Sequence, residues 1–469
     1  MHAGRGAAGA VALALLAGCS MAPDYRPPAV SAPAAYKTAA EPADGWVAAT
    51  PRDGEARGEW WRVYKDPVLA DLESRIERAS PSLAAALARY DQARAAVKGT
   101  RADLFPTLGA SASAERDRLS ANRPLAGSSA KYNDYTVGGS LSWELDLWGR
   151  VRNSVKAAKA EEQASAADLA SVRLALQAEL ADTYFTLRGL DAQTQLLRQT
   201  VEAYRRAYEL TATRHEGGIA SGLDTNRAQT QLSSVRAQLS DLAIQRAMAE
   251  NAIAALVGEV ASSFTLAPST QAIEPPPVPS GAPSDLLQRR PDIAAAERRV
   301  AAANARIGVA RAAFFPTLTL GAAGGYETTG ANLLSAPSLF WAVGPAAAVL
   351  SLFDGGRRAA ATRQARAELE EAAATYRSTV LTAFREVEDN LAQRAYLARE
   401  AKDQQEAAAA AERTSDLAFV RYRDGASDYL EVVTAQTAAL DAQRTVLDLH
   451  TRRLQASVDA VRVLGGAYE

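Results

Sequence analysis

The sequence predicts a mainly α-helical fold with a few short β-strands, built from two similar halves of one chain. The tetrapeptide Phe105–Leu108 (Phe-Pro-Thr-Leu) recurs as Phe315–Leu318. Two long segments without proline, about 151–214 and 357–423, each end at a glycine-containing turn. Short stretches of alternating apolar and polar residues precede both long segments. A duplication of this size determines the architecture before any single residue is considered.

The first 18 residues are predicted to be a targeting signal. A basic residue precedes an apolar run that ends in Leu16–Cys19 (Leu-Ala-Gly-Cys). This arrangement is typical of a bacterial lipoprotein signal, in which Cys19 becomes the lipid-bearing, palmitate-modified first residue of the mature chain. An ordinary secretory peptide cleaved near Ala17 or Gly18 is the alternative. Because Cys19 is the only cysteine, an internal disulfide is excluded.

Composition divides the mature chain into two repeats and two irregular segments. Residues 19–66 are rich in Pro, Ala and Gly and predict an extended, lipid-anchored segment. The first repeat covers 67–258, and its opening helical pattern stops at Phe105-Pro106, because proline cannot continue a helix interior. A linker with three consecutive prolines covers 259–283, and the second repeat covers 284–469.

Each repeat contains one predicted β-hairpin, at about 106–148 and about 316–353. In the clearest strand, Val137–Leu147, one face is apolar and the other polar over about ten residues, which is typical of a transmembrane strand. A half-buried strand of a soluble sheet shows the same alternation, so both interpretations stay open. Pro345 interrupts the last strand and predicts a β-bulge, because proline lacks the amide that a central strand requires.

The long helices have a narrow apolar stripe. Apolar residues of the first one recur at spacings of three, four and seven residues, which is typical of coiled-coil packing. At ~1.5 Å per residue this helix would extend over ~95 Å and would need partners along its length. If the strands span a membrane, several chains must share one barrel, because the smallest barrels use eight strands. The stripe consists of Leu169, Val172, Leu176, Leu180, Leu187 and Leu190.

Three local motifs are interpreted as structural. Asp146 and Asp354 border the transitions from strand to long helix, where they are expected to cap or turn the chain. Arg289–Asp292 (Arg-Arg-Pro-Asp) predicts the start of a helix, with proline in the first turn.

Composition and motifs exclude several functions. With 52 Lys+Arg against 54 Asp+Glu, the net charge of −2 provides no basic surface for nucleic acid. The histidines, His2, His215 and His450, lack the spacing of metal ligands. No nucleophile or phosphate-binding motif occurs. We therefore expect no enzyme activity, no cofactor and no metal.

Several motifs follow one another along the chain: Leu16–Cys19, Pro23–Pro28, Phe105–Leu108, Asp146–Arg150, Gln288–Ile293, Phe315–Leu318, Leu352–Arg357 and Arg421–Gly425. Together they resemble the outer membrane factors, which are TolC-like efflux channels, and in particular their NodT-type lipoprotein branch. The resemblance covers nearly the whole mature chain. It implies a homotrimer in which each chain contributes four strands to a twelve-stranded β-barrel, which continues into a long periplasmic α-helical barrel.

The resemblance also implies a function. The protein would be a lipid-anchored duct in the bacterial outer membrane, extending into the periplasm as the exit of a tripartite efflux pump. It would conduct small molecules passively to the exterior. Its partners would be an inner-membrane transporter of the RND type, a periplasmic adaptor (membrane fusion protein) and outer-membrane lipid. The sequence does not identify the cargo.

The family's periplasmic entrance closes where the helical hairpins converge. Where relatives have a gate tyrosine, leucine and aspartate, this chain has Tyr422, Leu430 and Thr434, so a neutral residue replaces the carboxylate. Glu431 lies at a position that is acidic in some relatives, and Asp428 is nearby.

In a trimer, copies of these carboxylates would form a ring that favours cations. Asp224 is the counterpart of Glu431 in the first repeat. Alternatively, Glu431 and Asp428 are solvated charges at a helix start. The turn residues Gly217, Gly218 and Gly425 are candidate contacts for the adaptor, although helix termination also explains them.

Two competing hypotheses are a lipid-anchored periplasmic adaptor and a lipid-anchored coiled-coil scaffold protein. Both would also have long helical hairpins and a lipid anchor. The two strand pairs, each close to membrane length, favour the channel.

Overall fold

The computed structural model describes residues 20–29, 37, 58–118, 120, 122, 131–276 and 289–466. The predicted signal peptide and Cys19 lie outside this set, as do parts of the predicted anchored segment and linker. The chain divides into two units. One contains the strands with residues 20–29 and the adjacent helix segments, within 89–166 and 295–377. The other contains the rest of the described chain.

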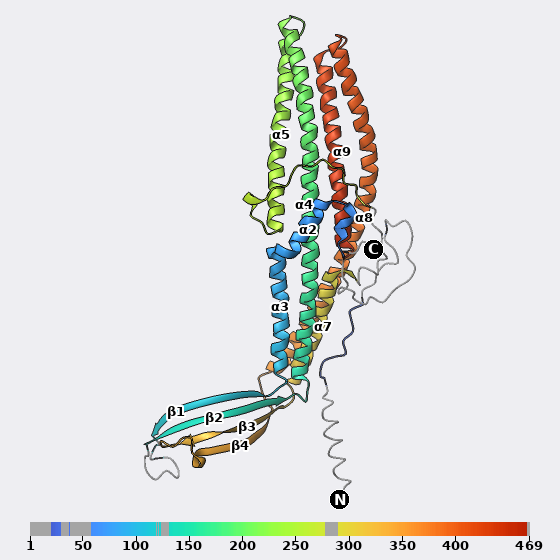
Figure 1. Ribbon diagram of the computed structural model, residues 1–469. Coiled ribbons are helices and arrows are strands. Elements are labelled where there is room, and N and C mark those ends of the chain that lie inside the picture. Colours follow the sequence, from blue (N-terminus) through green and yellow to red (C-terminus); the bar gives the residue numbers. More distant parts are fainter. Residues whose placement is uncertain are drawn as a thin grey trace. The chain divides into compact units, whose positions relative to one another are not determined.

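The predicted duplication is confirmed, because both halves contain the same elements in the same order (Figure 1). Counterparts have equal lengths of 22, 12, 67 and 35 residues, except that β2 has 15 residues and β4 has 11. The first half contains α3 (Pro81–Ala102), β1 (Thr107–Arg118), β2 (Lys131–Leu145), α4 (Arg150–Glu216) and α5 (Gly222–Leu256). The second half contains α7 (Pro291–Ala312), β3 (Thr317–Thr328), β4 (Leu339–Val349), α8 (Arg357–Arg423) and α9 (Tyr429–Val463).

Four further elements complete the described chain. The helix α2 and the 3-10 helix η1 precede the first repeat's α3, η2 follows α5, and η3 precedes β4. None of the helices in the described part of the chain combines the length and apolar character that crossing a bilayer requires. These elements are η1 (Trp60–Tyr64), α2 (Pro67–Ala79), η2 (Ala261–Ser263) and η3 (Ala336–Ser338).

The four strands form one antiparallel sheet in the order β1-β2-β3-β4, with β1 and β4 at its two edges (Figure 1). Every residue of β1 is exposed. The predicted bulge is confirmed, because the register of β3 and β4 shifts between Leu320 and Ala322, opposite the segment that contains Pro345. Neither edge strand has a second partner among the described residues.

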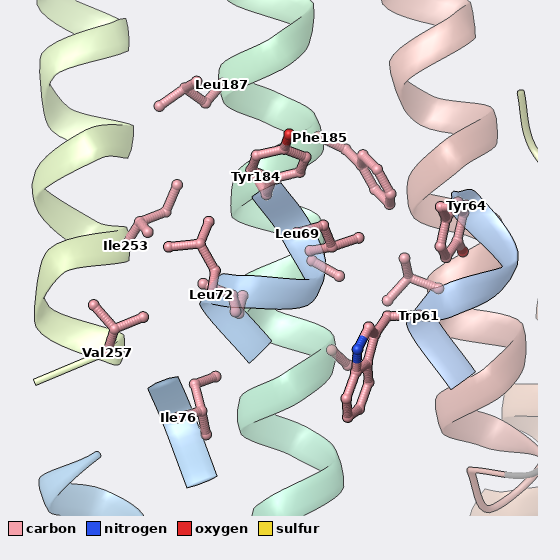
Figure 2. Packing of buried hydrophobic residues seen from close by; sticks show 14 of the residues in the cluster. Trp61, Tyr64, Leu69, Leu72, Ile76, Tyr184, Phe185, Leu187, Ile253 and Val257 are labelled. Carbon is pink, nitrogen blue, oxygen red and sulfur yellow. The ribbon is translucent and has the colours of Figure 1, made fainter. Parts of the chain in front are cut away.

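The α2 helix packs against α4, α5 and α9 through a cluster of apolar side chains (Figure 2). It begins at Pro67 because Asp66 caps it, accepting hydrogen bonds from two amide nitrogens of the first turn. Leu69, Leu72 and Ile76 then lie on one face and are fully buried. Burying each such side chain stabilises the fold by about 1.5–3 kcal/mol.

A buried ionic network attaches the chain after α5 to the long helix α4. Asp191 accepts hydrogen bonds from Arg188 Nη1 at 3.0 Å, from Arg246 Nε at 2.7 Å and from the Ser269 amide at 3.0 Å. The same guanidinium groups donate to main-chain carbonyls at 2.9 and 2.7 Å. Those carbonyls belong to Ala267 and Leu266.

Residues 20–25 run antiparallel to α7. The Asn304 side chain donates to the Pro23 carbonyl at 2.9 Å, and the Tyr25 hydroxyl donates to Glu297. This close approach requires a glycine on α7, since a Cβ at Gly308 would lie 2.8 Å from Ala22.

The structural roles predicted for the two aspartates are confirmed. Asp146 accepts from the amides of Val151 and Arg152 at 3.0 and 2.8 Å, and so caps α4. Asp354 accepts from the Arg358 amide at 3.1 Å at the start of α8. Asp146 also forms an ion pair with the guanidinium group of Arg152, and Asp354 forms one with that of Arg358.

The predicted helix start at residues 289–292 is also confirmed. The α7 helix begins at Pro291. The buried Arg290 pairs with Asp292 at 2.7 Å and with Glu386 of α8 at 2.8 Å, and it donates to the Val463 carbonyl of α9. This motif therefore has a packing role.

Candidate functional site

The two hairpin turns have the same hydrogen-bonding pattern. In each, a glycine with positive φ follows the long helix: Gly218 at +75° and Gly425 at +79°. The amide after that glycine donates to the carbonyl five residues earlier, which is a Schellman motif. These bonds are Ile219 to Arg214 at 2.8 Å and Ala426 to Arg421 at 2.8 Å. The glycines are therefore required by the turns, whatever else they contact.

The second hairpin contains two buried tyrosines beside its turn. Tyr422, at the end of α8, is only 5% exposed, and its ring lies 5.2 Å from that of Tyr429 at the start of α9. The Tyr422 hydroxyl donates to Thr211 Oγ1 of α4 at 3.2 Å. Burial raises the pKa of Tyr429 above its ordinary value, so that phenol stays neutral. The predicted gate tyrosine thus lies in contact with the first hairpin.

Arg214 joins the two hairpins across this cluster. Its guanidinium group donates to the carbonyls of Tyr422 at 2.8 Å and Arg423 at 2.6 Å, and it lies 4.8 Å from the Tyr422 ring centre. A cation is favourable there, because the last carbonyls of α8 carry partial negative charge. Arg214 was not among the residues predicted from the sequence, since nothing local identifies carbonyl partners in another helix.

The structure brings the other second-hairpin candidates together on the first turns of α9. Leu430, Glu431 and Thr434 are all exposed. Glu431 pairs with Arg421 at 3.2 Å, and Asp428 caps α9 by accepting from the Glu431 amide at 3.1 Å. This face therefore combines one exposed leucine with a paired acid.

Asp224 lies in the other hairpin, at the start of α5. It forms a capping box with Ser221 and pairs with Arg227 at 3.5 Å. The exposed Leu223 precedes it, as Leu430 precedes Glu431. The interpretation of these acids as helix-start charges therefore matches the observed caps.

Among the described residues, no group of three or more His, Cys, Asp and Glu side chains could hold a metal ion. The features at the hairpin ends are a buried tyrosine pair, one bridging arginine and an exposed face of α9. This arrangement can hold hairpins together or release them, and it offers no reactive centre.

Comparisons with known proteins agree with this geometry. Residues 72–259 and 282–466 match the family described as Outer membrane efflux protein. The chain is 34% identical over 465 residues to the probable efflux pump outer membrane protein TtgC of Pseudomonas putida, covering 98% of this chain and 95% of the relative. It is 35% identical to outer membrane protein OprJ of Pseudomonas aeruginosa, over 97% of this chain and 94% of OprJ.

Solved channel structures agree as well. The outer-membrane channel OprN matches with a TM-score of 0.87 and 29% identity, over 96% of this chain and 100% of that one. The open state of the MtrE outer membrane channel of Neisseria gonorrhoeae matches with a TM-score of 0.82 and 27% identity, over 96% and 99%. These matches exclude the adaptor and scaffold hypotheses. The chain belongs to the outer membrane efflux protein family and is a non-enzymatic outer-membrane channel of an efflux pump.

Proposed function

We propose that three copies of this chain form the exit duct of a tripartite pump, with a shared twelve-stranded β-barrel in the outer membrane and a long α-helical barrel in the periplasm. The observation that carries this proposal is the sheet of four strands, in which β1 is exposed and neither β1 nor β4 has a second partner among the described residues. Open strand edges are not viable in lipid, and the smallest barrels need eight strands. Three sheets of four strands satisfy both requirements.

A lipid on Cys19 would anchor each chain in the outer membrane. Support comes from Ser20, the first described residue, whose hydroxyl donates to Asn153 in the first turn of α4 at 3.0 Å. The Met21 carbonyl accepts from Arg311 near the end of α7, next to β3. Both contacts attach the start of the mature chain to helix ends that adjoin strands, where a lipid would reach the membrane.

At the other end of the helices, the exposed face of Leu430, Glu431 and Thr434 would line the periplasmic aperture, with Asp428 beside it. Tyr422 would hold this face through its contact with the first hairpin, where Asp224 is the counterpart of Glu431. The support is the exposure of this face beside a buried attachment.

The turns at Gly217, Gly218 and Gly425 would contact a periplasmic adaptor, and the pump would use an inner-membrane transporter of the RND type. All three glycines are exposed. The names of relatives refer to toluene, antibiotics and pyoverdine. Such different molecules support a passive duct, in which the transporter selects the cargo.

Conductance in planar bilayers tests the gate. Replacing Asp428 and Glu431 together by Ala should raise the leak, because a charge-paired rim is lost. Asp428→Asn with Glu431→Gln removes the charge but keeps a capping side chain, so it separates the two effects. Asp424→Ala with Asp448→Ala is the matched control, since both are exposed acids elsewhere on the second hairpin. Unchanged leak in both gate variants would remove these acids from the gate.

Native mass spectrometry of detergent-extracted protein tests the assembly and the anchor. A trimer whose subunits each carry the mass of the lipid would support both. A monomer that is stable without detergent would contradict the shared barrel.

A further inference from the structure

The repeats differ in length at the end of β4. The strand β2 ends at Leu145, five residues before α4 begins at Arg150 (150 − 145 = 5). The strand β4 ends at Val349, eight residues before α8 begins at Arg357 (357 − 349 = 8). Residues 350–352, which correspond to the last three residues of β2, are therefore not in a strand.

The pairing of β2 explains why these residues differ. Its last three residues, 143–145, lie beyond the start of β1, which pairs only as far as Ser142. They are held by β3 alone, with Trp143 opposite Leu320 and Leu145 opposite Leu318. Residues at such a strand end pair only with the next strand of the sheet, so they adopt strand structure only where that next strand is present. For β4, the chain itself supplies no next strand among the described residues.

The repeat identifies what the next strand would be. Leu318 belongs to the second Phe-Pro-Thr-Leu motif, and Leu108 is its counterpart in the first. The strand that corresponds to β3 is therefore β1, which is the other open edge of the sheet. In one chain β1 and β4 are separated by two strands, so the β1 that follows β4 must come from a second copy.

We propose that residues 350–352 of one copy complete β4 by pairing antiparallel with residues 108–110 of a second copy, with Leu352 opposite Leu108 and Leu350 opposite Ala110. This inference rests on the proposed trimer and adds the register of its subunit interface. It applies the observed pairing of 143–145 with 318–320 to the counterpart residues.

Exposure of the side chains supports this register. Leu145 and Leu318, which pair within the chain, are both partly covered. Their counterparts Leu352 and Leu108 are 89% and 79% exposed. Opposed side chains in an antiparallel pair lie ~4.5–5.5 Å apart on one face, so the proposed pairing would cover both leucines together.

Aromatic residues near these leucines also differ in exposure between the contact within the chain and the two open edges of the sheet. Phe315 stacks on Trp148 of the same chain, with ring centres 4.7 Å apart. Its counterpart Phe105 is 66% exposed, and Phe353, next to Leu352, is 92% exposed. The proposed register brings Phe353 of one copy towards Phe105 of the next. Two exposed aromatic rings would thereby gain a partner at the subunit boundary.

Cysteine cross-linking of the full chain in outer membranes tests this register. Leu108→Cys with Leu352→Cys should shift the monomer band to a covalent trimer on a non-reducing denaturing gel after mild oxidation. Directly opposed residues satisfy the ~4.4–6.8 Å Cα separation that a disulfide requires. Ala110→Cys with Leu350→Cys is a second pair in the same register, for use if the first variant does not reach the membrane.

Two controls make the result specific. Leu108→Cys with Ala348→Cys lies four residues out of register on the same face and should stay monomeric on the gel. Leu145→Cys with Leu318→Cys should form an intrachain disulfide, detected as loss of free thiol without a trimer band. Each single variant measures background from Cys19 and from random contacts.

The outcomes distinguish the register from the assembly. A trimer by native mass spectrometry that cross-links only through the out-of-register pair, or through none of the pairs, would overturn the register and leave the proposed duct intact. A protein that is monomeric by native mass spectrometry would overturn both. Covalent trimers from the in-register pairs alone would establish the interface.

Discussion

The bond between the hairpins through Arg214 gives the sharpest prediction about gating. Arg214→Met keeps the aliphatic length but removes two hydrogen bonds to carbonyls of α8, at 2.8 and 2.6 Å. A hydrogen bond from a charged donor contributes ~1.5–3 kcal/mol. Because Arg214 is partly exposed, solvent screening reduces the pair to about 2 kcal/mol per chain. The ratio of separated to joined hairpins should then rise about 30-fold per chain.

Single-channel recordings in planar bilayers would measure this change as a higher open probability. Arg214→Lys should give an intermediate value, because lysine keeps the charge but cannot bind two carbonyls as a fork. Arg423→Met is the matched control, since the Arg423 side chain is exposed and pairs with the adjacent Asp424. The reasoning is refuted if Arg214→Met channels stay closed like the unmodified protein, or if Arg423→Met opens them equally.

Three further predictions concern stability and the mature N-terminus. Asp191→Ala should destabilise the fold by about 3–5 kcal/mol, seen as a lower Tm by circular dichroism, because it leaves buried guanidinium groups without their carboxylate. Burial and the nearby Asp459 raise the pKa of Asp182 to about 7. The folded state therefore keeps a proton that the unfolded chain loses, and stability falls from about pH 4 to about pH 7. Asp182→Asn should remove this slope and raise stability at pH 8 by up to about 4 kcal/mol, because the pKa is raised by about three units. Thermal unfolding at about pH 4 and pH 8 measures both effects. Gly308→Ala should release residues 20–25 and speed cleavage by chymotrypsin after Tyr25, whereas Gly99→Ala, where an added Cβ meets no atom within 4 Å, should not.

The elements that follow from local rules were predictable from the sequence. Both glycine turns, the aspartate caps at Asp146 and Asp354 and the bulge near Pro345 depend on residues within a few positions of each other. The duplication required only a comparison of the chain with itself. The order of the elements therefore follows from short-range patterns along the chain.

Contacts between distant helices could not be predicted in this way. Arg188 and Asp191 have the spacing of an ordinary exposed helical pair, yet they are buried because the chain after α5 crosses them. Glu73 lies among apolar residues of α2, and burial raises its pKa well above the ordinary value. No pattern among neighbouring residues in the sequence indicates that the Arg188–Asp191 pair or Glu73 is buried.

The candidate gate shows the same limit. Its residues were named by resemblance, which gave their positions in the sequence and not their surroundings. The contact of Tyr422 with Thr211 and the capping role of Asp428 depend on how α4, α8 and α9 pack. Tyr429 was missed because an aromatic residue at a helix start has no distinguishing pattern.

The equal lengths of the paired helices restrict how such a chain can change. Insertion of one helical turn into α4 alone would carry Gly218 about 5.4 Å along the axis and away from Gly425. The bond of Arg214 to the α8 carbonyls would then be lost. A longer or shorter duct therefore needs matching insertions or deletions in α4, α5, α8 and α9. Four separate segments of one gene therefore determine the length of the duct. We expect selection against an insertion or deletion in only one of them.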